Sequence, residues 1–213
     1  MIIYIVRKME SKFTIQHNEA KDILIITFGG IAKKLDGILP FEFLNFLSKN
    51  MPKYDMQFYI DLHGQWYNKG LLGITKTIDE TVEYLRTEIK DYKKVYFIGN
   101  SCGGYAAILF GSLLNITAVI AFAPQTIIYN KDADNNYKDI KPYINSKTEY
   151  YLYGDLSYTD KTNMHHISQI EHISEFRNVY TFRRRGINLQ KMRDSGELFR
   201  IINGVITGMP ITN

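Results

Sequence analysis

Residues 99–103 read Gly-Asn-Ser-Cys-Gly and directly follow the apolar run 94–98. An apolar run, this turn and the small residues after it predict a sharp strand–turn–helix connection with Ser101 at its apex. Gly99 and Gly103 permit a strained, closely packed backbone that side chains at these positions would block. Such a turn lifts the hydroxyl above the sheet edge and aims the next N–H and the helix N-terminus at the same spot. Ser101 is therefore a candidate nucleophile for acyl transfer.

Strand and helix patterns alternate along the chain. The periodicity predicts strands at 2–7, 12–17, 23–28, 56–62, 94–98, 118–122, 148–153 and 178–183. Helices are predicted after Pro40 and at 75–92, 103–114, 162–174 and 188–203, and 130–145 is predicted to be irregular. Apolar runs such as 23–26 and 119–122 are typical of a parallel sheet that is buried on both faces. We expect one α/β domain over 1–213: a mostly parallel central sheet with helices on both faces and no large lid.

The composition narrows the function classes. Hydrophobic residues make up 45% of the chain, and the net charge of +4 is scattered rather than striped, so we expect no nucleic-acid partner. The single cysteine, Cys102, rules out an internal disulfide and indicates a reducing, cytoplasmic location. Residues 1–7 read as a strand rather than a signal peptide, and no apolar stretch reaches the roughly 20 residues of a membrane span. Neither a zinc-ligand spacing nor a phosphate-binding glycine motif occurs, so no metal and no resident cofactor are expected; the oligomeric state is left open.

Loops at the carboxyl ends of parallel strands gather at one edge of the sheet. Gly29 and Gly30 follow an early strand, and an N–H group there would complete an oxyanion hole with the N–H of Cys102; an ordinary turn is the alternative. Trp66 and Tyr67 follow another strand. Their rings suit a sugar-binding site, or they pack against the sheet.

Two segments carry a resemblance to a known family. Residues 97–107 (Phe-Ile-Gly-Asn-Ser-Cys-Gly-Gly-Tyr-Ala-Ala) and 121–126 (Ala-Phe-Ala-Pro-Gln-Thr) resemble the small α/β-hydrolase-fold proteins of bacterial polysaccharide loci. Residues 66–70 and 193–198 fit the same pattern, so the resemblance extends over about 23–203. The family includes serine esterases and capsular-polysaccharide O-acetyltransferases. The resemblance implies acetyl ester chemistry on a small-molecule or saccharide substrate, with acetyl-coenzyme A as a donor substrate of transferases.

The resemblance also implies an acid after the strand at 148–153. The family pattern places it several residues past a Tyr-Gly pair, here Tyr153-Gly154, and so indicates Asp160. Asp155 is closer to the strand end and is the geometric alternative. Either carboxylate could instead cap a turn, and Asp160 suits that role because a helix is predicted to open directly after it.

The expected catalytic base is missing from its usual place. The family pattern after the last strand is Gly-His-Asn, whereas 186–188 reads Gly-Ile-Asn, so Ile187 stands at the histidine position. Isoleucine cannot accept a proton, and general-base assistance is worth about 10²–10⁴-fold. His63, at the carboxyl end of a strand, is the first substitute by location, and His165 and His166 are the others. A structural role is the alternative for each of them.

Two function classes follow. The first is a serine-dependent acyl hydrolase or O-acyltransferase acting on a sugar or surface polysaccharide, with Ser101 as nucleophile, Asp160 as acid and His63 as base. The second, which Ile187 favours, is a catalytically inactive binding or scaffolding protein of the same fold in polysaccharide biosynthesis. A substitution introduced at residue 187 to trap a complex is the third explanation, but isoleucine is an odd choice for that purpose. Cys102 is interpreted as a small buried residue rather than a nucleophile.

Overall fold

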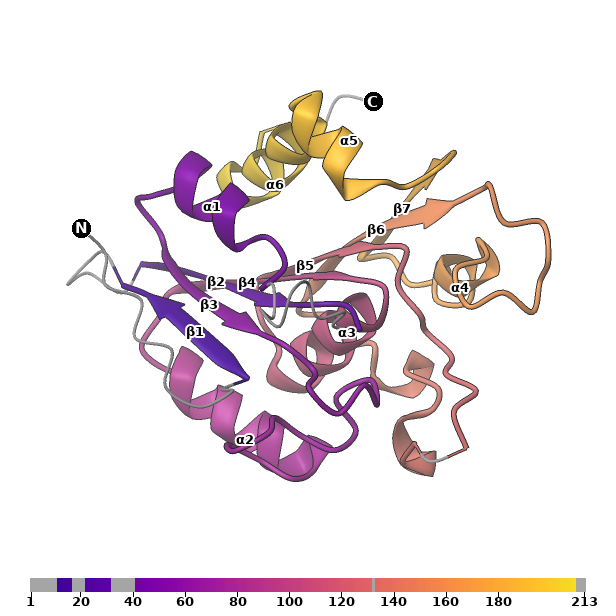
Figure 1. Ribbon diagram of the computed structural model, residues 1–213, viewed down its shortest axis with the longest axis horizontal. Coiled ribbons are helices and arrows are strands. Elements are labelled where there is room, and N and C mark those ends of the chain that lie inside the picture. The colour runs from indigo at the N-terminus through magenta and orange to yellow at the C-terminus, as the bar shows by residue number, and fades with distance from the viewer. Residues whose placement is uncertain (1–10, 17–21, 32–40, 132, 210–213) are drawn as a thin grey trace, which may run out of the picture.

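The fold is known from a computed structural model that describes residues 11–16, 22–31, 41–131 and 133–209 (Figure 1). A seven-stranded sheet in the order β1-β3-β2-β4-β5-β6-β7 forms its centre. The strands are β1 (Lys12–Ile15), β2 (Ile23–Phe28), β3 (Asp55–Tyr59), β4 (Lys94–Asn100), β5 (Ala118–Phe122), β6 (Glu149–Asp155) and β7 (Val179–Arg184). Only β1 is antiparallel to its neighbour, which confirms the predicted mostly parallel sheet among the residues described. The strand predicted at 2–7 lies outside them.

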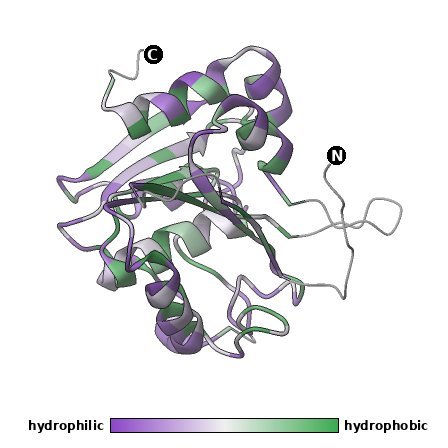
Figure 2. Ribbon diagram, turned by 90° about the vertical axis from the view of Figure 1, so that its left-hand side faces the viewer, coloured by the Kyte–Doolittle hydropathy of each residue, from purple (hydrophilic) through white to green (hydrophobic). Residues whose placement is uncertain are grey.

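Helices cover both faces of the sheet. One face carries α1 (Leu44–Asn50), α5 (Leu189–Asp194) and α6 (Glu197–Thr207), and the other carries α2 (Ile78–Ile89) and α3 (Cys102–Leu114) (Figure 1). Each face has its own apolar cluster, and the hydrophobic residues gather along the strands between the two layers (Figure 2). The continuous apolar runs of β2 and β5 lie between these layers, as the sequence pattern predicted.

Two predicted helices differ in the structure. The helix predicted at 162–174 is reduced to the short α4 (Ser168–Glu171), preceded by turns. Asp160 and Asn163 accept hydrogen bonds through their side chains from the backbone N–H groups of Thr162 and His165, which competes with helix formation. The helix predicted at 188–203 is divided into α5 and α6, because Gly196 adopts a left-handed φ of 75° between them.

The turn after β4 explains why α3 lies directly on the sheet. A Cβ on Gly99 would lie 2.0 Å from the carbonyl oxygen of Gly103, and a Cβ on Gly103 would lie 2.0 Å from that of Phe28. Only glycine fits at either position. This close approach fixes the first turn of α3 at the carboxyl edge of the sheet, where Ser101 lies.

Candidate active site

Ser101 occupies the apex of the turn between β4 and α3. Its backbone has φ 54° and ψ −121°, a strained conformation for a residue with a side chain, and its N–H donates to the carbonyl oxygen of Phe122 at 2.9 Å. Cys102 begins α3, so its N–H has no acceptor within the helix. The geometry presents a half-buried hydroxyl beside a helix N-terminus, as the sequence predicts.

His165 is the histidine whose ring contacts this serine. Its Nε2 lies 2.8 Å from Ser101 Oγ. Burial lowers the pKa of His165 below its ordinary value, although the negative charge of Asp155 opposes this effect. A neutral imidazole with its Nε2 toward the hydroxyl can accept the serine proton. The backbone N–H of His165 donates to Asn163 Oδ1 at 2.8 Å, and the Tyr158 ring lies 5.6 Å from the imidazole between centroids.

Asp155, the last residue of β6, is the carboxylate beside this histidine segment. It is buried, and its backbone forms a parallel bridge with His166. Its Oδ1 accepts from the N–H groups of Ser157 and Gly186, and its Oδ2 accepts from that of Ile187 at 2.8 Å. Burial alone would raise the pKa of Asp155, but these N–H donors lower it below its ordinary value. Asp155 thus remains ionised and joins the loops that follow β6 and β7.

Asp160 and His63 are the acid and the base named first from the sequence. Among the described residues, neither of them forms a hydrogen bond with Ser101. Asp160 is exposed, and its carboxylate accepts from the N–H and hydroxyl of Thr162, which is the turn-capping role given as its alternative. His63 is exposed, and its backbone N–H donates to Asp61 Oδ1. The family pattern indicated Asp160, and the place of His63 after a strand favoured that histidine, but it is His165, five residues beyond Asp160, that contacts Ser101. The turns that carry His165 were expected to be helix.

Ile187 lies beside the Asp155 carboxylate, in the loop after β7. Its N–H binds Asp155, while its side chain packs against the apolar cluster that α1, α5 and α6 form on the sheet. The loop after β7 therefore binds the Asp155 carboxylate through backbone N–H groups and has an isoleucine, not a histidine, at residue 187.

Both candidate oxyanion glycines already have acceptors. The N–H of Gly29 donates to the Tyr59 carbonyl oxygen at 2.9 Å, and that of Gly30 donates to Glu42 Oε2 at 2.9 Å. Glu42 Oε1 in turn accepts from the Asn100 side chain at 3.0 Å, and burial raises the pKa of Glu42. Gly30 is close to Ser101, since a Cβ built on it would lie 4.0 Å from the Cβ of Ser101. Glu42, which the sequence analysis did not single out, therefore occupies the N–H of Gly30.

Trp66 and Tyr67 have different surroundings. Tyr67 is fully buried, and its hydroxyl donates to the carbonyl oxygen of Gly29 at 2.9 Å, so its ring has no free face for a sugar. The partly buried Trp66 donates from its indole Nε1 to Gln125 Oε1 at 3.1 Å. The Gln125 Nε2 lies 3.4 Å from Ser101 Oγ. Gln125 belongs to a segment that carries the family resemblance, but its type and position alone gave it no role.

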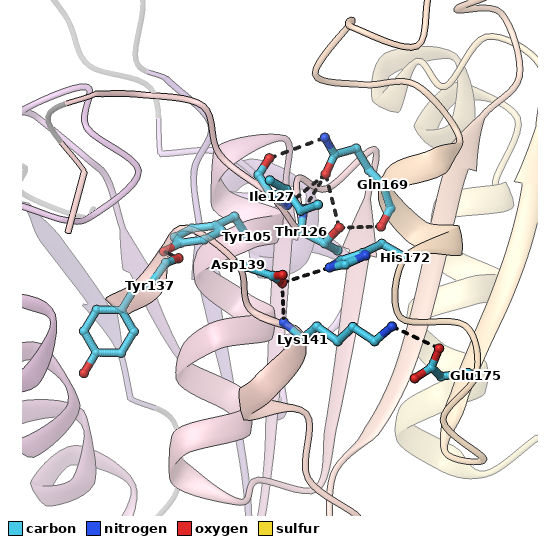
Figure 3. Close-up of polar contacts among 9 residues, drawn as sticks. All are labelled: Tyr105, Thr126, Ile127, Tyr137, Asp139, Lys141, Gln169, His172 and Glu175. Carbon is cyan, nitrogen blue, oxygen red and sulfur yellow. Dashed lines mark hydrogen bonds and ion pairs between the residues drawn. The ribbon is translucent and has the colours of Figure 1, made fainter. Parts of the chain in front are cut away.

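Gln169, in α4, binds Thr126 and Ile127, which follow Gln125 in the chain (Figure 3). Its Oε1 accepts from the N–H groups of Thr126 at 2.7 Å and Ile127 at 3.0 Å. The Thr126 hydroxyl donates to the Gln169 carbonyl oxygen. The segment that carries His165 is thereby attached to the loop next to Ser101.

The described residues give less support to a metal centre or to a cysteine nucleophile. Within the described ranges, no group of three His, Cys, Asp or Glu residues could hold a metal ion. Burial raises the pKa of the Cys102 thiol far above its ordinary value, so it remains protonated, as expected of a structural cysteine. None of the helices described is long and apolar enough to cross a membrane.

Comparisons with known proteins identify the fold. No protein-family model and no curated protein sequence matches the chain. A capsule O-acetyltransferase of Neisseria meningitidis serogroup A superposes with a TM-score of 0.63 at 16% identity, over 90% of this chain and 89% of that one. FphF, a fluorophosphonate-binding serine hydrolase of Staphylococcus aureus, gives 0.59 at 11% identity over 90% and 86%. A Pyrococcus furiosus esterase gives 0.56 at 15% identity over 92% and 83%. With its sheet order, its strand–turn–helix at Ser101 and these neighbours, the chain has the α/β-hydrolase fold.

Proposed function

We propose that this protein is a serine-dependent acyl hydrolase or O-acyltransferase that handles acetyl esters, with Ser101 as nucleophile, His165 as base and Asp155 as the acid whose negative charge stabilises the protonated base. The observation that carries the proposal is the 2.8 Å contact between Ser101 Oγ and His165 Nε2, with the ionised Asp155 beside it. A general base within hydrogen-bond reach of a hydroxyl is what activates a serine.

The reaction would proceed through an acyl-enzyme. Ser101 Oγ attacks the carbonyl carbon of the acyl donor as its proton passes to His165 Nε2, and the carbonyl electron pair moves onto oxygen. The N–H of Cys102 at the start of α3 stabilises that oxyanion. When the intermediate collapses, the donor oxygen or sulfur leaves with the proton from His165. Water or an acceptor hydroxyl then attacks the acyl group by the reverse sequence.

The substrate class is drawn from the neighbours. One of the matching structures is the meningococcal capsule O-acetyltransferase in complex with CoA. This neighbour supports a saccharide hydroxyl as the acyl acceptor and acetyl-coenzyme A as the acyl donor. The fold alone does not distinguish such a transfer from simple ester hydrolysis. Trp66, whose ring is only partly buried, is the aromatic residue that we propose for contact with a sugar.

A fluorophosphonate probe and p-nitrophenyl acetate test the nucleophile. We expect labelling and turnover in the wild-type protein, and loss of both in Ser101→Ala. Ser174→Ala, which changes an exposed serine, should behave like wild type. Release of free thiol from acetyl-coenzyme A upon addition of oligosaccharide acceptors would then separate a transferase from a hydrolase.

Ile187 favours a second candidate, an inactive binding protein of the same fold. That candidate predicts neither labelling nor turnover at any pH in a folded wild-type protein. It also predicts that the 2.8 Å contact of His165 with Ser101 has no kinetic consequence.

A further inference from the structure

We propose that the Gln125 carboxamide donates a hydrogen bond to the reacting oxygen atoms at Ser101, and that the Trp66 indole holds it in the orientation this requires. The inference rests on the proposed serine chemistry and adds a catalytic residue, Gln125, and a positioning residue, Trp66.

The first argument is the place of the amide. Gln125 is 1% exposed, and its Nε2 lies 3.4 Å from Ser101 Oγ and 3.5 Å from the carbonyl oxygen of Ala123. An amide nitrogen carries two hydrogens, so it can serve both acceptors. Both distances are long for hydrogen bonds, and the contact in the resting state is therefore weak. Hydrogen bonds to a charged oxygen are shorter and stronger, so the amide binds the carbonyl oxygen of the substrate more strongly as negative charge develops on that oxygen beside Ser101.

The second argument fixes which end of the amide faces the serine. An indole N–H can only donate, and that of Trp66 lies 3.1 Å from Gln125 Oε1. The opposite orientation of the amide would place two donors against each other. The carboxamide oxygen must therefore face Trp66, and the NH₂ group must face Ser101.

Trp66 is itself rigidly placed. The carboxylate of Asp61, which is 1% exposed, accepts hydrogen bonds from the backbone N–H groups of the residues around it. The donors are His63, Gly64, Gln65 and Tyr67. Because these hydrogen bonds fix the loop that carries Trp66, we infer that the indole N–H keeps a constant position relative to the Gln125 amide.

Backbone strain marks the same place. Trp66, Ser101 and Ala123 all have left-handed φ values, 51°, 54° and 41°, although none of them is glycine. Such conformations persist only where the surrounding structure imposes them, and they gather at functional sites. The three strained residues are the hydrogen-bond partners of the Gln125 side chain.

The third argument concerns the other candidate donors. The N–H groups of Gly29 and Gly30 are bound to Tyr59 and Glu42. The Gln125 amide, in contrast, already contacts Ser101 Oγ. Together with the N–H of Cys102, it can supply the pair of donors that an oxyanion requires.

The test uses steady-state hydrolysis of p-nitrophenyl acetate. Gln125→Met keeps the length of the side chain and removes the donor. We expect kcat to fall about 10²–10³-fold, as for removal of one oxyanion donor, with little change in KM. Gln125→Glu keeps the acceptor toward Trp66 but presents an anion to the serine, and it should be impaired at least as strongly. The rate of fluorophosphonate labelling should fall in parallel.

A double-mutant cycle tests the positioning role. Trp66→Phe should lower kcat by less than Gln125→Met, and the double variant should be no slower than Gln125→Met alone, since Trp66 acts through the amide. Additive losses would overturn the positioning role. Gln190→Met, the same change at an exposed glutamine, is the matched control and should retain wild-type kcat.

Failure of this inference can be told apart from failure of the proposed function. Serine-dependent turnover in wild type, with Gln125→Met and Gln125→Glu folded and within about threefold of its kcat, would overturn the inference alone. A wild-type protein without Ser101-dependent activity or labelling would overturn both.

Discussion

At the scale of single residues, the proposed base lies on a different loop from the histidine of the family pattern. Ile187 stands where the pattern has histidine, yet its N–H still binds the acid. The imidazole comes instead from His165, on the turns between β6 and α4. The proposed base and the N–H group of Ile187 that binds the proposed acid therefore come from two different loops.

The proposed base predicts a specific kinetic defect. His165→Gln should lower kcat on p-nitrophenyl acetate about 10²–10⁴-fold, because an amide cannot take the serine proton. His63→Gln changes an exposed histidine and should leave kcat unchanged. Equal effects of the two substitutions would contradict the assignment.

The pH profile provides an independent check on the same histidine. The imidazole must be neutral to accept a proton, and burial lowers the pKa of His165 below the ordinary 6.5. Activity should therefore rise with pH through a midpoint below 6.5 and should already be high at neutral pH. A midpoint above 6.5 in kcat/KM would show that a different group titrates, or that Asp155 dominates over burial.

The sequence could predict the place of a site residue only where neighbours in the chain fix the backbone around it. The place of Ser101 was predictable because its turn is fixed by neighbouring glycines. The choice between Asp155 and Asp160 depended on N–H groups of the distant residues Gly186 and Ile187, which no local pattern shows. The contact of Gln125 with Trp66 joins residues that are 59 positions apart, so no local pattern could predict it either.

At the scale of elements, the segment between β6 and β7 is where the helical pattern failed and where the site is assembled. Its apolar spacing resembles that of a helix, but side-chain caps from Asp160 and Asn163 turn the chain. These turns place His165 against Ser101. Gln169 in α4 then anchors the segment to the loop of Thr126 and Ile127 (Figure 3).

That anchor can be tested by Gln169→Leu. The substitution leaves the buried N–H of Thr126 without its acceptor, at a cost of about 1–3 kcal/mol for one such group. We expect a lower free energy of unfolding in urea and a decrease in kcat, because His165 loses its fixed position. Glu171→Gln is the control on the same helix. It removes only the exposed ion pair with Arg183 and should change stability by less than about 1 kcal/mol.

At the scale of the whole molecule, the architecture was more predictable than the site. Apolar runs in β2, β4 and β5 indicate strands buried on both faces, and the intervening patterns place helices on both sides. Burial of these runs depends only on hydrophobic residues at the spacing typical of strands, and many different sequences have such a pattern. A neighbour at 16% identity therefore shares the fold over 90% of the chain, whereas the histidine position differs from the family pattern.

The position of Asp155 also makes a prediction for the stability of the whole fold. This buried carboxylate joins the ends of β6 and β7, and its N–H donors lower its pKa in the folded state. A group with a lowered pKa stabilises the fold above its unfolded pKa, about 3.9, and this contribution is lost as pH falls through the folded value. The free energy of unfolding of the wild-type protein should therefore decline below about pH 4.

Asp155→Asn should be less stable at neutral pH, because one carboxylate oxygen becomes a donor facing N–H groups. Its stability should also depend less on pH below about pH 4, since the linked proton is gone. Urea unfolding at several pH values measures both effects. Asp91→Asn, at an exposed aspartate, should follow the wild-type curve. If Asp155→Asn kept the wild-type acid dependence, carboxylates other than the one at the end of β6 would control the acid stability of the fold.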